Sequence, residues 1–218
     1  HKTPNLFLTF CKYIYKIKPN GSVDILTTSK GNFMIFFAIM EDDKKTIWLG
    51  NKEGLYSFKN KKLTPFQPKK FTYKVTDLMY HPTWGKVAGT RDEGLFLIGK
   101  ENFTKINGLL ANDITSLFVD LKGKLWVGTK KGVNILNKTK SGKIKIDCLT
   151  KSQGLYSNEI TSIYVDKTNA WVGTKKGLSK IDLHYFSRYK GNYHIRLNSI
   201  KLKDKSLDIK KELSIPLN

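Results

Sequence analysis

The fold of this chain is decided by the stretch LWVGTKKGV, residues 125–133, because the chain repeats it. The stretch returns almost unchanged as AWVGTKKGL at 170–178, and more loosely as IWLGNKEGL at 47–55 and KVAGTRDEGL at 86–95. Consecutive copies start about 40 residues apart, a period typical of proteins built from repeated small sheets. The repeat therefore organises most of the chain.

A second strand-like segment precedes each copy. ITSLFVD at 114–120 matches ITSIYVD at 160–166, and VTDLMY at 75–80 is a looser version. Polar and large apolar residues alternate in these segments, as they do in strands with one buried face. A weaker strand, such as IKIDC at 144–148, follows the Gly-Leu segment. Each unit thus predicts four antiparallel strands, the content of one β-propeller blade; a solenoid of strands is the alternative.

The two ends of the chain depart from the repeat. Residues 13–17 and 22–26 look like the last two strands of a preceding blade. A closed ring typically needs more than four blades, and the chain begins with His1 and not with Met, so we expect a fragment of a larger propeller. Near the C-terminus the repeat stops, which predicts blades over 1–188 and a linker with the opening strands of a separate β-domain over 189–218.

The repeated core resembles the two-component regulator propeller repeat. Its pattern, Gly-Leu-x-x-Asn-x-Ile-x-Ser-Ile followed by Leu-Trp-Val-Gly-Thr, is matched by GLLANDITSL at 108–117 with WVGT at 126–129, and by GLYSNEITSI at 154–163 with WVGT at 171–174. The second of the four repeats is degenerate, with Val87 where the tryptophan belongs.

The tail resembles the start of the triple-tyrosine (Y_Y_Y) domain, an immunoglobulin-like sandwich that follows these propellers. The matching stretches are LNSIKL at 197–202 and LSIPLN at 213–218. The expected fold class is therefore all-β: four propeller blades and a partial blade, followed by the first strands of an immunoglobulin-like sandwich.

The resemblance implies a function. Members of this family are periplasmic sensors of bacterial hybrid two-component systems, so we expect a ligand-sensing ectodomain of an inner-membrane protein, with a histidine kinase outside this chain. The family also implies an oligosaccharide ligand and a homodimer of the full-length protein. One alternative is a propeller scaffold for protein–protein interaction without signalling output. A weaker alternative is a propeller lyase or hydrolase.

Charge and hydropathy limit the classes of partner that we expect this chain to bind. The formal net charge is +21, but only three of the 39 basic residues are arginines. Because proteins that read nucleic acids favour the bidentate arginine fork, we expect no nucleic acid. The longest apolar run, FMIFFAIM at 33–40, is far shorter than the ~20 residues that span a bilayer. Membrane attachment is therefore expected only through segments outside this chain.

One face of the predicted propeller carries the candidate binding site. Loops that enter the inner strands share this face with the turns that follow the tryptophan strands. In the two later blades these turns bring lysine pairs that we expect to be uncompensated, which suits an acidic sugar by charge and hydrogen bonding. The candidate ligand-binding residues are Lys130, Lys131, Lys175, Lys176, Arg91, Tyr156 and Asn158.

No sequence motif indicates catalytic or metal-binding chemistry. The histidines His81, His184 and His194 have no ligand spacing, and we expect no cofactor, no metal and no enzyme. Residues 41–43, Glu-Asp-Asp, are expected to form a hairpin turn.

Tryptophans and cysteines are assigned structural roles. The three repeat tryptophans, Trp48, Trp126 and Trp171, hold a fixed place in a strand, so we expect them to pack between blades and not to stack on sugars. The two cysteines, Cys11 and Cys148, stand alone in sequence and are expected to be free thiols, with a disulfide as the alternative.

Overall fold

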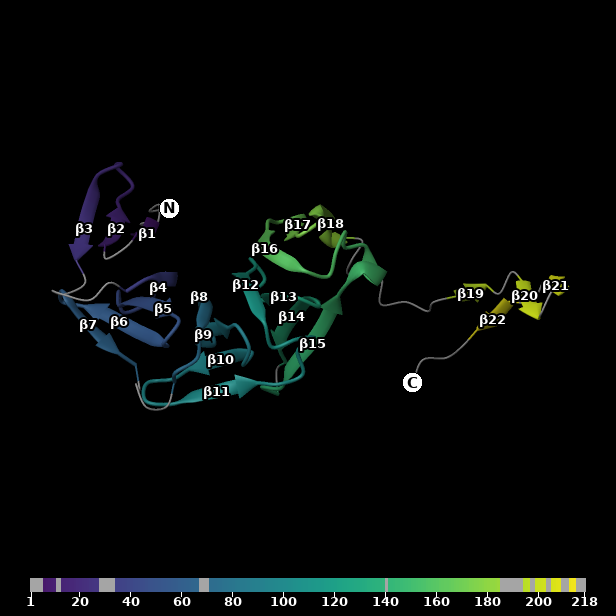
Figure 1. Ribbon diagram of the computed structural model, residues 1–218, viewed down its shortest axis with the longest axis horizontal. Coiled ribbons are helices and arrows are strands. Elements are labelled where there is room, and N and C mark those ends of the chain that lie inside the picture. The colour runs from purple at the N-terminus through teal and green to yellow at the C-terminus, as the bar shows by residue number, and fades with distance from the viewer. Residues whose placement is uncertain are drawn as a thin grey trace. The chain divides into compact units, whose positions relative to one another are not determined.

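The computed structural model describes residues 6–10, 13–27, 34–66, 71–139, 141–184, 194–196, 199–202, 205–208 and 212–214. Its contacts divide the chain into two units, His1–Ile181 and Asp182–Asn218. The sequence placed a boundary a few residues later, between 188 and 189. The first unit consists of antiparallel sheets that follow one another in chain order (Figure 1).

Three sheets of the first unit have four strands each, and consecutive strands are neighbours in each sheet. The first of them is formed by β4 (Phe36–Glu41), β5 (Ile47–Asn51), β6 (Leu55–Lys59) and β7 (Lys62–Pro65). The second is formed by β8 (Val75–His81), β9 (Gly85–Thr90), β10 (Leu95–Ile98) and β11 (Phe103–Ile106). The third is formed by β12 (Ile114–Val119), β13 (Leu125–Thr129), β14 (Gly132–Lys138) and β15 (Ile144–Leu149). These are the predicted blades.

The sheets at the two ends of the first unit have three strands among the described residues. The N-terminal sheet is formed by β1 (Leu6–Phe10), β2 (Tyr13–Ile17) and β3 (Val23–Thr27). The sequence predicted β2 and β3 but not β1. The fourth repeat forms β16 (Ile160–Val165), β17 (Asn169–Thr174) and β18 (Gly177–Asp182), and a short 3-10 helix at Lys151–Gln153 precedes it.

The strands β4, β8, β12 and β16 are the inner strands, and each contacts the next one. All four carry a β-bulge at the same place, one residue after the start of the strand. A bulge leaves one residue unpaired and turns its side chain out of the ladder. The bulged positions are Phe37, Thr76, Thr115 and Thr161.

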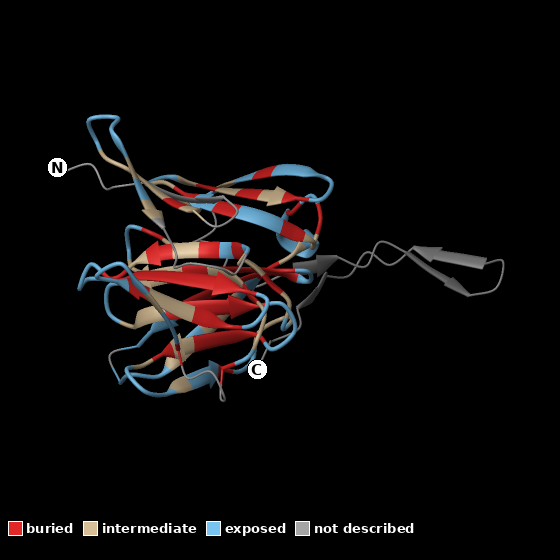
Figure 2. Cartoon of the chain, turned by 60° about the vertical axis from the view of Figure 1, so that its left-hand side comes forward, coloured by how far each residue is buried: buried red, intermediate tan, exposed pale blue. Residues whose placement is uncertain are grey.

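The apolar core lies between neighbouring sheets, and Figure 2 shows buried residues concentrated in the strands and exposed ones at the turns. Trp48 and Leu55 of the β4–β7 sheet pack against Val75 and Leu78 of the next inner strand. Trp48 is 9% exposed and Trp126 is 2% exposed, so both are packing residues, as predicted. Trp171 is half-buried, and the ammonium of Lys180 lies 5.1 Å from its ring centroid.

An aspartate at the end of the inner strand fixes each repeat tryptophan. Asp120 accepts hydrogen bonds from the backbone N–H groups of Lys122 and Lys124, both at 2.9 Å, and from the Trp126 indole at 3.0 Å. The same indole bond joins Trp48 to Asp42 and Trp171 to Asp166. The predicted hairpin at residues 41–43 is thus confirmed, and its aspartate has a structural role.

In the second blade both members of this pair are replaced. His81 takes the place of the aspartate, and Val87 takes the place of the tryptophan. The imidazole Nδ1 accepts the backbone N–H groups of Thr83 at 3.1 Å and Trp84 at 3.3 Å. Nε2 lies 3.0 Å from the carbonyl oxygen of Gly123 in the next blade's turn. His81 is 1% exposed, so it is a structural residue.

The second unit contains two small antiparallel pairs. Strand β19 (His194–Arg196) pairs with β22 (Glu212–Ser214), and β20 (Ser199–Leu202) pairs with β21 (Lys205–Asp208). Strands were expected at 195–202 and from 213, and β21 was not predicted. The immunoglobulin-like sandwich stays a prediction, and the expected linker at 185–192 lies outside the described residues. No helix within the described ranges has the length and apolar content needed to cross a bilayer.

Candidate functional site

A hollow of about 380 Å³ opens where three inner strands begin. It is built by the β8–β11, β12–β15 and β16–β18 sheets. The bulged threonines Thr76, Thr115 and Thr161 line it together with basic side chains from the loops and turns around them. The full lining consists of Lys74, Thr76, Arg91, Asp113, Ile114, Thr115, Lys130, Glu159, Ile160, Thr161 and Lys175.

Two ion pairs lie at the rim of this hollow. Lys130, on the β13–β14 turn, pairs with Asp113 in the loop before β12. Lys175, on the β17–β18 turn, pairs with Glu159 before β16 at 2.5 Å. The hydrogen bond and charge of Lys175 lower the pKa of Glu159. These pairs show that the loops entering the inner strands and the turns after the tryptophan strands share one face, as predicted.

The hollow keeps an excess of positive charge. Four basic side chains and two carboxylates line it. Among the described residues, no carboxylate forms an ion pair with Arg91 or Lys74, and the Lys74 ammonium lies 5.0 Å from the centroid of the Phe37 ring. A net positive charge at such a hollow suits an anion, which these basic side chains can bind by charge-assisted hydrogen bonds.

The structure places the seven predicted site residues in two groups. Arg91, Lys130 and Lys175 line the hollow. The others do not line it, although Lys131 and Lys176 stand on the same turns. The lysine pairs were expected to be uncompensated, and this was wrong for one lysine of each pair. The reason is that the carboxylates lie in loops that only folding brings beside the turns.

Tyr156 and Asn158 stand in the loop before β16 and form hydrogen bonds that hold it in place. The ring of Tyr156 is 64% exposed, and its backbone N–H donates to Ser179 at 2.8 Å. Asn158 accepts the backbone N–H of Lys151 at 2.8 Å. The amide of Asn158 therefore shapes the loop.

Sequence reasoning missed the threonines and Lys74. The signal was present, because Thr76, Thr115 and Thr161 recur at one position of the repeat. Their place at the hollow depends on the bulge, and strict alternation along a strand would have placed them differently. The hydroxyl of Thr76 donates to the carbonyl oxygen of Ile114 at 2.7 Å, and that of Thr115 is buried.

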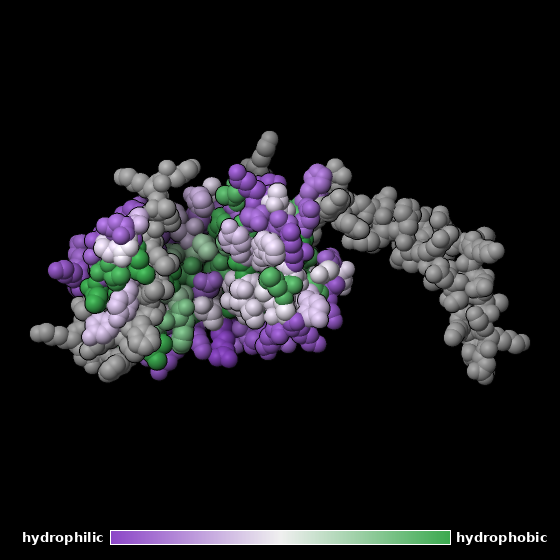
Figure 3. Space-filling view, turned by 90° about the horizontal axis from the view of Figure 1, so that it is seen from above, coloured by the Kyte–Doolittle hydropathy of each residue, from purple (hydrophilic) through white to green (hydrophobic). Residues whose placement is uncertain are grey.

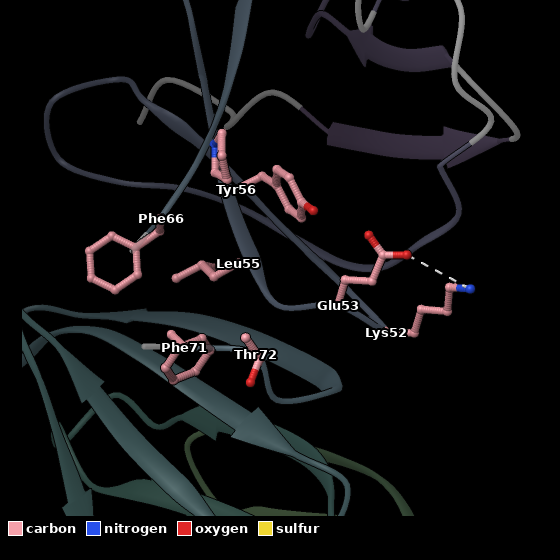
Figure 4. Close-up of a pocket in the computed structure, with 8 residues that line it drawn as sticks. Lys52, Glu53, Leu55, Tyr56, Phe66, Phe71 and Thr72 are labelled. Carbon is pink, nitrogen blue, oxygen red and sulfur yellow. Dashed lines mark ion pairs between the residues drawn. The ribbon is translucent and has the colours of Figure 1, made fainter. Parts of the chain in front are cut away.

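A second hollow, of about 450 Å³, lies between the β4–β7 sheet and the segment that enters β8. Figure 4 shows Leu55, Phe66 and Phe71 around it, with the ion pair of Lys52 and Glu53 at one side, whose Nζ and Oε1 are 3.8 Å apart. Its apolar residues are part of the core between these sheets. In the view of Figure 3, hydrophilic side chains predominate on the described part of the visible face, and apolar areas are smaller.

Among the described residues, no histidine or cysteine lines either hollow. No cluster of three or more His, Cys, Asp or Glu side chains suited to a metal is present in the described part of the chain. Cys148 forms no disulfide and the residue is exposed. Partial burial of its sulfur, together with the charge of Asp147, raises the pKa of the thiol. Cys11 lies outside the described residues.

Comparisons with known proteins bear on the fold. No protein-family model matches the sequence, and no curated protein matches it. The extracellular domain of one regulatory system of B. thetaiotaomicron, solved twice and described once as a one-component and once as a hybrid two-component system, is 20% identical, with TM-scores of 0.64 and 0.63. The match covers 92% of this chain and 27% of that domain.

Two further structures extend the likeness. The extracellular domain assigned to another hybrid two-component system of B. thetaiotaomicron has 16% identity and a TM-score of 0.61, over 94% of this chain and 32% of that one. Virginiamycin B lyase from Staphylococcus aureus has 11% identity and a TM-score of 0.57, over 84% of this chain and 66% of the lyase.

The first unit of the chain consists of β-propeller blades. At these identities the likeness establishes the fold alone. The chain spans less than a third of the length of the sensor domains. The similar structures include sensor domains and an enzyme, so the fold by itself does not assign an activity.

Proposed function

We propose that this chain is part of the extracytoplasmic ligand-sensing region of a hybrid two-component system, located in the periplasm, and that it recognises an oligosaccharide. The proposal includes transmission of the signal to a cytoplasmic histidine kinase and a homodimer in the full-length protein. Its support is the likeness to the two sensor ectodomains, together with the repeat pattern at 108–129 and 154–174. The start of a triple-tyrosine domain after the blades belongs to the same proposal.

The observation that carries the ligand class is the hollow at the start of the inner strands. It combines an excess of basic side chains with two isoleucines, Ile114 and Ile160. Charged groups bind the polar substituents of a sugar, and the apolar side chains contact its C–H surface. The charge favours an acidic oligosaccharide over a neutral one.

Calorimetric titration tests this proposal with two acidic probes, an oligogalacturonate and a heparin-derived oligosaccharide, and with a maltooligosaccharide as the neutral probe. We expect one acidic probe to bind and the neutral probe to bind at least about tenfold more weakly. The reason is that one charge-assisted hydrogen bond contributes about 1.5–3 kcal/mol, and the neutral probe cannot form it with the basic side chains. Affinity should fall with added salt.

Matched variants locate the site. Changing Lys130, Lys131, Lys175 and Lys176 to Ser should weaken binding and flatten its salt dependence. The control changes Lys122, Lys124, Lys138 and Lys143 to Ser, because these lysines stand at the turns on the opposite edge of the β12–β15 sheet. Arg91→Ser is a sharper variant, since Arg91 has no ion-pair partner among the described residues and its loss exposes no carboxylate. Equal affinity in the site variants and the control would remove the hollow as the binding site.

A further inference from the structure

Three junctions between neighbouring blades share one close contact. The first glycine of the repeat faces a β-branched residue that starts the next inner strand. A Cβ atom placed on Gly128 would lie 2.8 Å from Cγ2 of Ile160, and one on Gly89 would lie 2.5 Å from Cγ2 of Ile114. Gly50 stands in the same relation to Val75. The glycine thus forms a notch that only a side chain of the next blade fills.

In the last sheet, no side chain of another sheet enters this notch within the described residues. A Cβ atom placed on Gly173 would lie 2.4 Å from Oγ of Ser162 and 3.0 Å from Oγ1 of Thr161, both in its own sheet. The neighbouring apolar position is uncovered as well. Leu178 is 64% exposed, whereas its counterparts Leu55, Leu95 and Val133 are exposed by 2%, 0% and 0%.

A hydrogen-bonding group on the same side is also unused. In two filled junctions a polar side chain of one inner strand accepts a backbone N–H of the next inner strand. Asp77 accepts from Leu117 at 2.7 Å, and Ser116 accepts from Ile163 at 3.2 Å. Ser162 is the counterpart in the last sheet, and within the described residues it accepts no such bond. We call Ser162, Trp171, Gly173 and Leu178 together the open face.

We propose that the open face binds a further blade-type sheet. The inner strand of that sheet brings a valine or isoleucine to Gly173 and a backbone N–H to the hydroxyl of Ser162. Three copies of the contact within this chain define that chemistry, so the occupant is a twisted antiparallel sheet and not a helix or a lipid surface. Occupation buries Leu178 and the exposed part of Trp171.

The N-terminal sheet offers the other half of such a site. Val23 and Ile25 on β3 are 53% and 59% exposed, and they point to the side opposite Leu26, which packs against the β4–β7 sheet. A blade-type partner has two faces of this kind, one for each end. The inference does not depend on the sensing role.

An extended chain tests the proposal. A second copy of residues 138–182 inserted after Asp182 supplies an outer strand for β18 and an inner strand whose isoleucine can reach Gly173. We expect Leu178→Ser to lower the melting temperature of the extended protein by about 5 °C, as loss of a buried leucine does. The matched control is the same insertion with its copy of Ile160 changed to Asp, in which Leu178→Ser should have no effect. If Leu178→Ser is harmless in both extended proteins, the proposal is wrong.

The original chain supplies a second test, which does not require the insertion to fold. Leu178→Ser should leave its melting temperature within about 1 °C, whereas Leu55→Ser, at the covered position, should lower it by about 5 °C or more. Equal losses at the two positions would show that Leu178 is already covered and would overturn the proposal. Analytical sedimentation tests whether the original chain forms a dimer through the open face. A dimer of the original chain that Leu178→Ser dissociates would make a second copy the occupant, contrary to the proposal.

Discussion

Two titratable residues of the second blade, Asp77 and His81, join it to the third blade. The carboxylate of Asp77 accepts the backbone N–H of Leu117, and the imidazole of His81 lies against the carbonyl of Gly123. Both contacts cross between blades, so the protonation of each residue is linked to the stability of this junction. The two residues respond to pH in opposite directions.

Burial raises the pKa of Asp77 to about 6, although backbone N–H groups of Leu117 and Leu78 oppose the shift. Because this pKa lies above that of an unfolded aspartate, the folded state binds the proton more tightly, and stability should rise as the pH falls from about 7 towards 4. Asp77→Asn should remove about 1–2 kcal/mol of this rise. Urea midpoints followed by tryptophan fluorescence at several pH values measure it. An unchanged pH slope in the variant would contradict the assignment.

Burial lowers the pKa of His81. The unfolded state therefore binds the proton more tightly, and stability is lost as the pH falls below the unfolded value of about 6.5. Protonation of Nδ1 would also end its bonds from Thr83 and Trp84. We expect His81→Asn to lose this acid sensitivity, because an asparagine oxygen can accept the same N–H groups without titrating. His184→Asn is the matched control, since His184 is exposed, and it should keep the sensitivity.

At the scale of the element, the inner strand with its bulge does two things. In β8, β12 and β16 it begins the sheet against the glycine of the preceding sheet, and its bulge places a threonine at the hollow. The packing of sheets and the candidate binding site therefore come from the same few residues of the repeat. A change that shifts an inner strand should affect both.

The glycine notch gives a direct prediction. Gly128→Val should destabilise the protein by about 1–3 kcal/mol, because its side chain would overlap Ile160 in a filled junction. Gly173→Val is the comparison variant: its Cβ would lie 2.4 Å from Oγ of Ser162, a short side chain that can rotate away, and we expect a smaller loss of stability than for Gly128→Val. Chemical unfolding of both variants measures the difference. The reverse order of stabilities would rule out the packing role of Gly128.

At the scale of the whole molecule, charge is the dominant feature. The net charge is +21, and the ion pairs among the described residues are mostly exposed, so each contributes little. Repulsion among lysines opposes the compact state. Basic charges spread over every sheet therefore make the folded chain sensitive to ionic strength.

We expect the urea midpoint to rise when NaCl is increased from about 20 to about 300 mM, because the screening length falls below about 10 Å. All four tryptophans, Trp48, Trp84, Trp126 and Trp171, lie in the first unit, so their fluorescence reports on the blades. KCl at equal ionic strength is the control and should give the same rise. A midpoint that falls with salt would mean that attractive pairs dominate.

The sequence by itself determined the blades. Period-2 alternation, glycines at fixed places and repetition predicted the inner strands, the tryptophan strands and their order, because these signals act between residues close in the chain. The role of the tryptophans as packing residues followed from the same regularity. The sequence also placed Arg91, Lys130 and Lys175 on one face.

Only the tertiary structure decided which charges meet and which residues form the hollow. The ion pairs of Lys130 with Asp113 and of Lys175 with Glu159 join turns to loops, and no local pattern specifies such a pairing. The bulge that places Thr115 at the hollow and the contact of His81 with the carbonyl of Gly123 in the next blade belong to the same class. These features depend on how one sheet stacks against the next, and that stacking is fixed by contacts between residues about 40 positions apart.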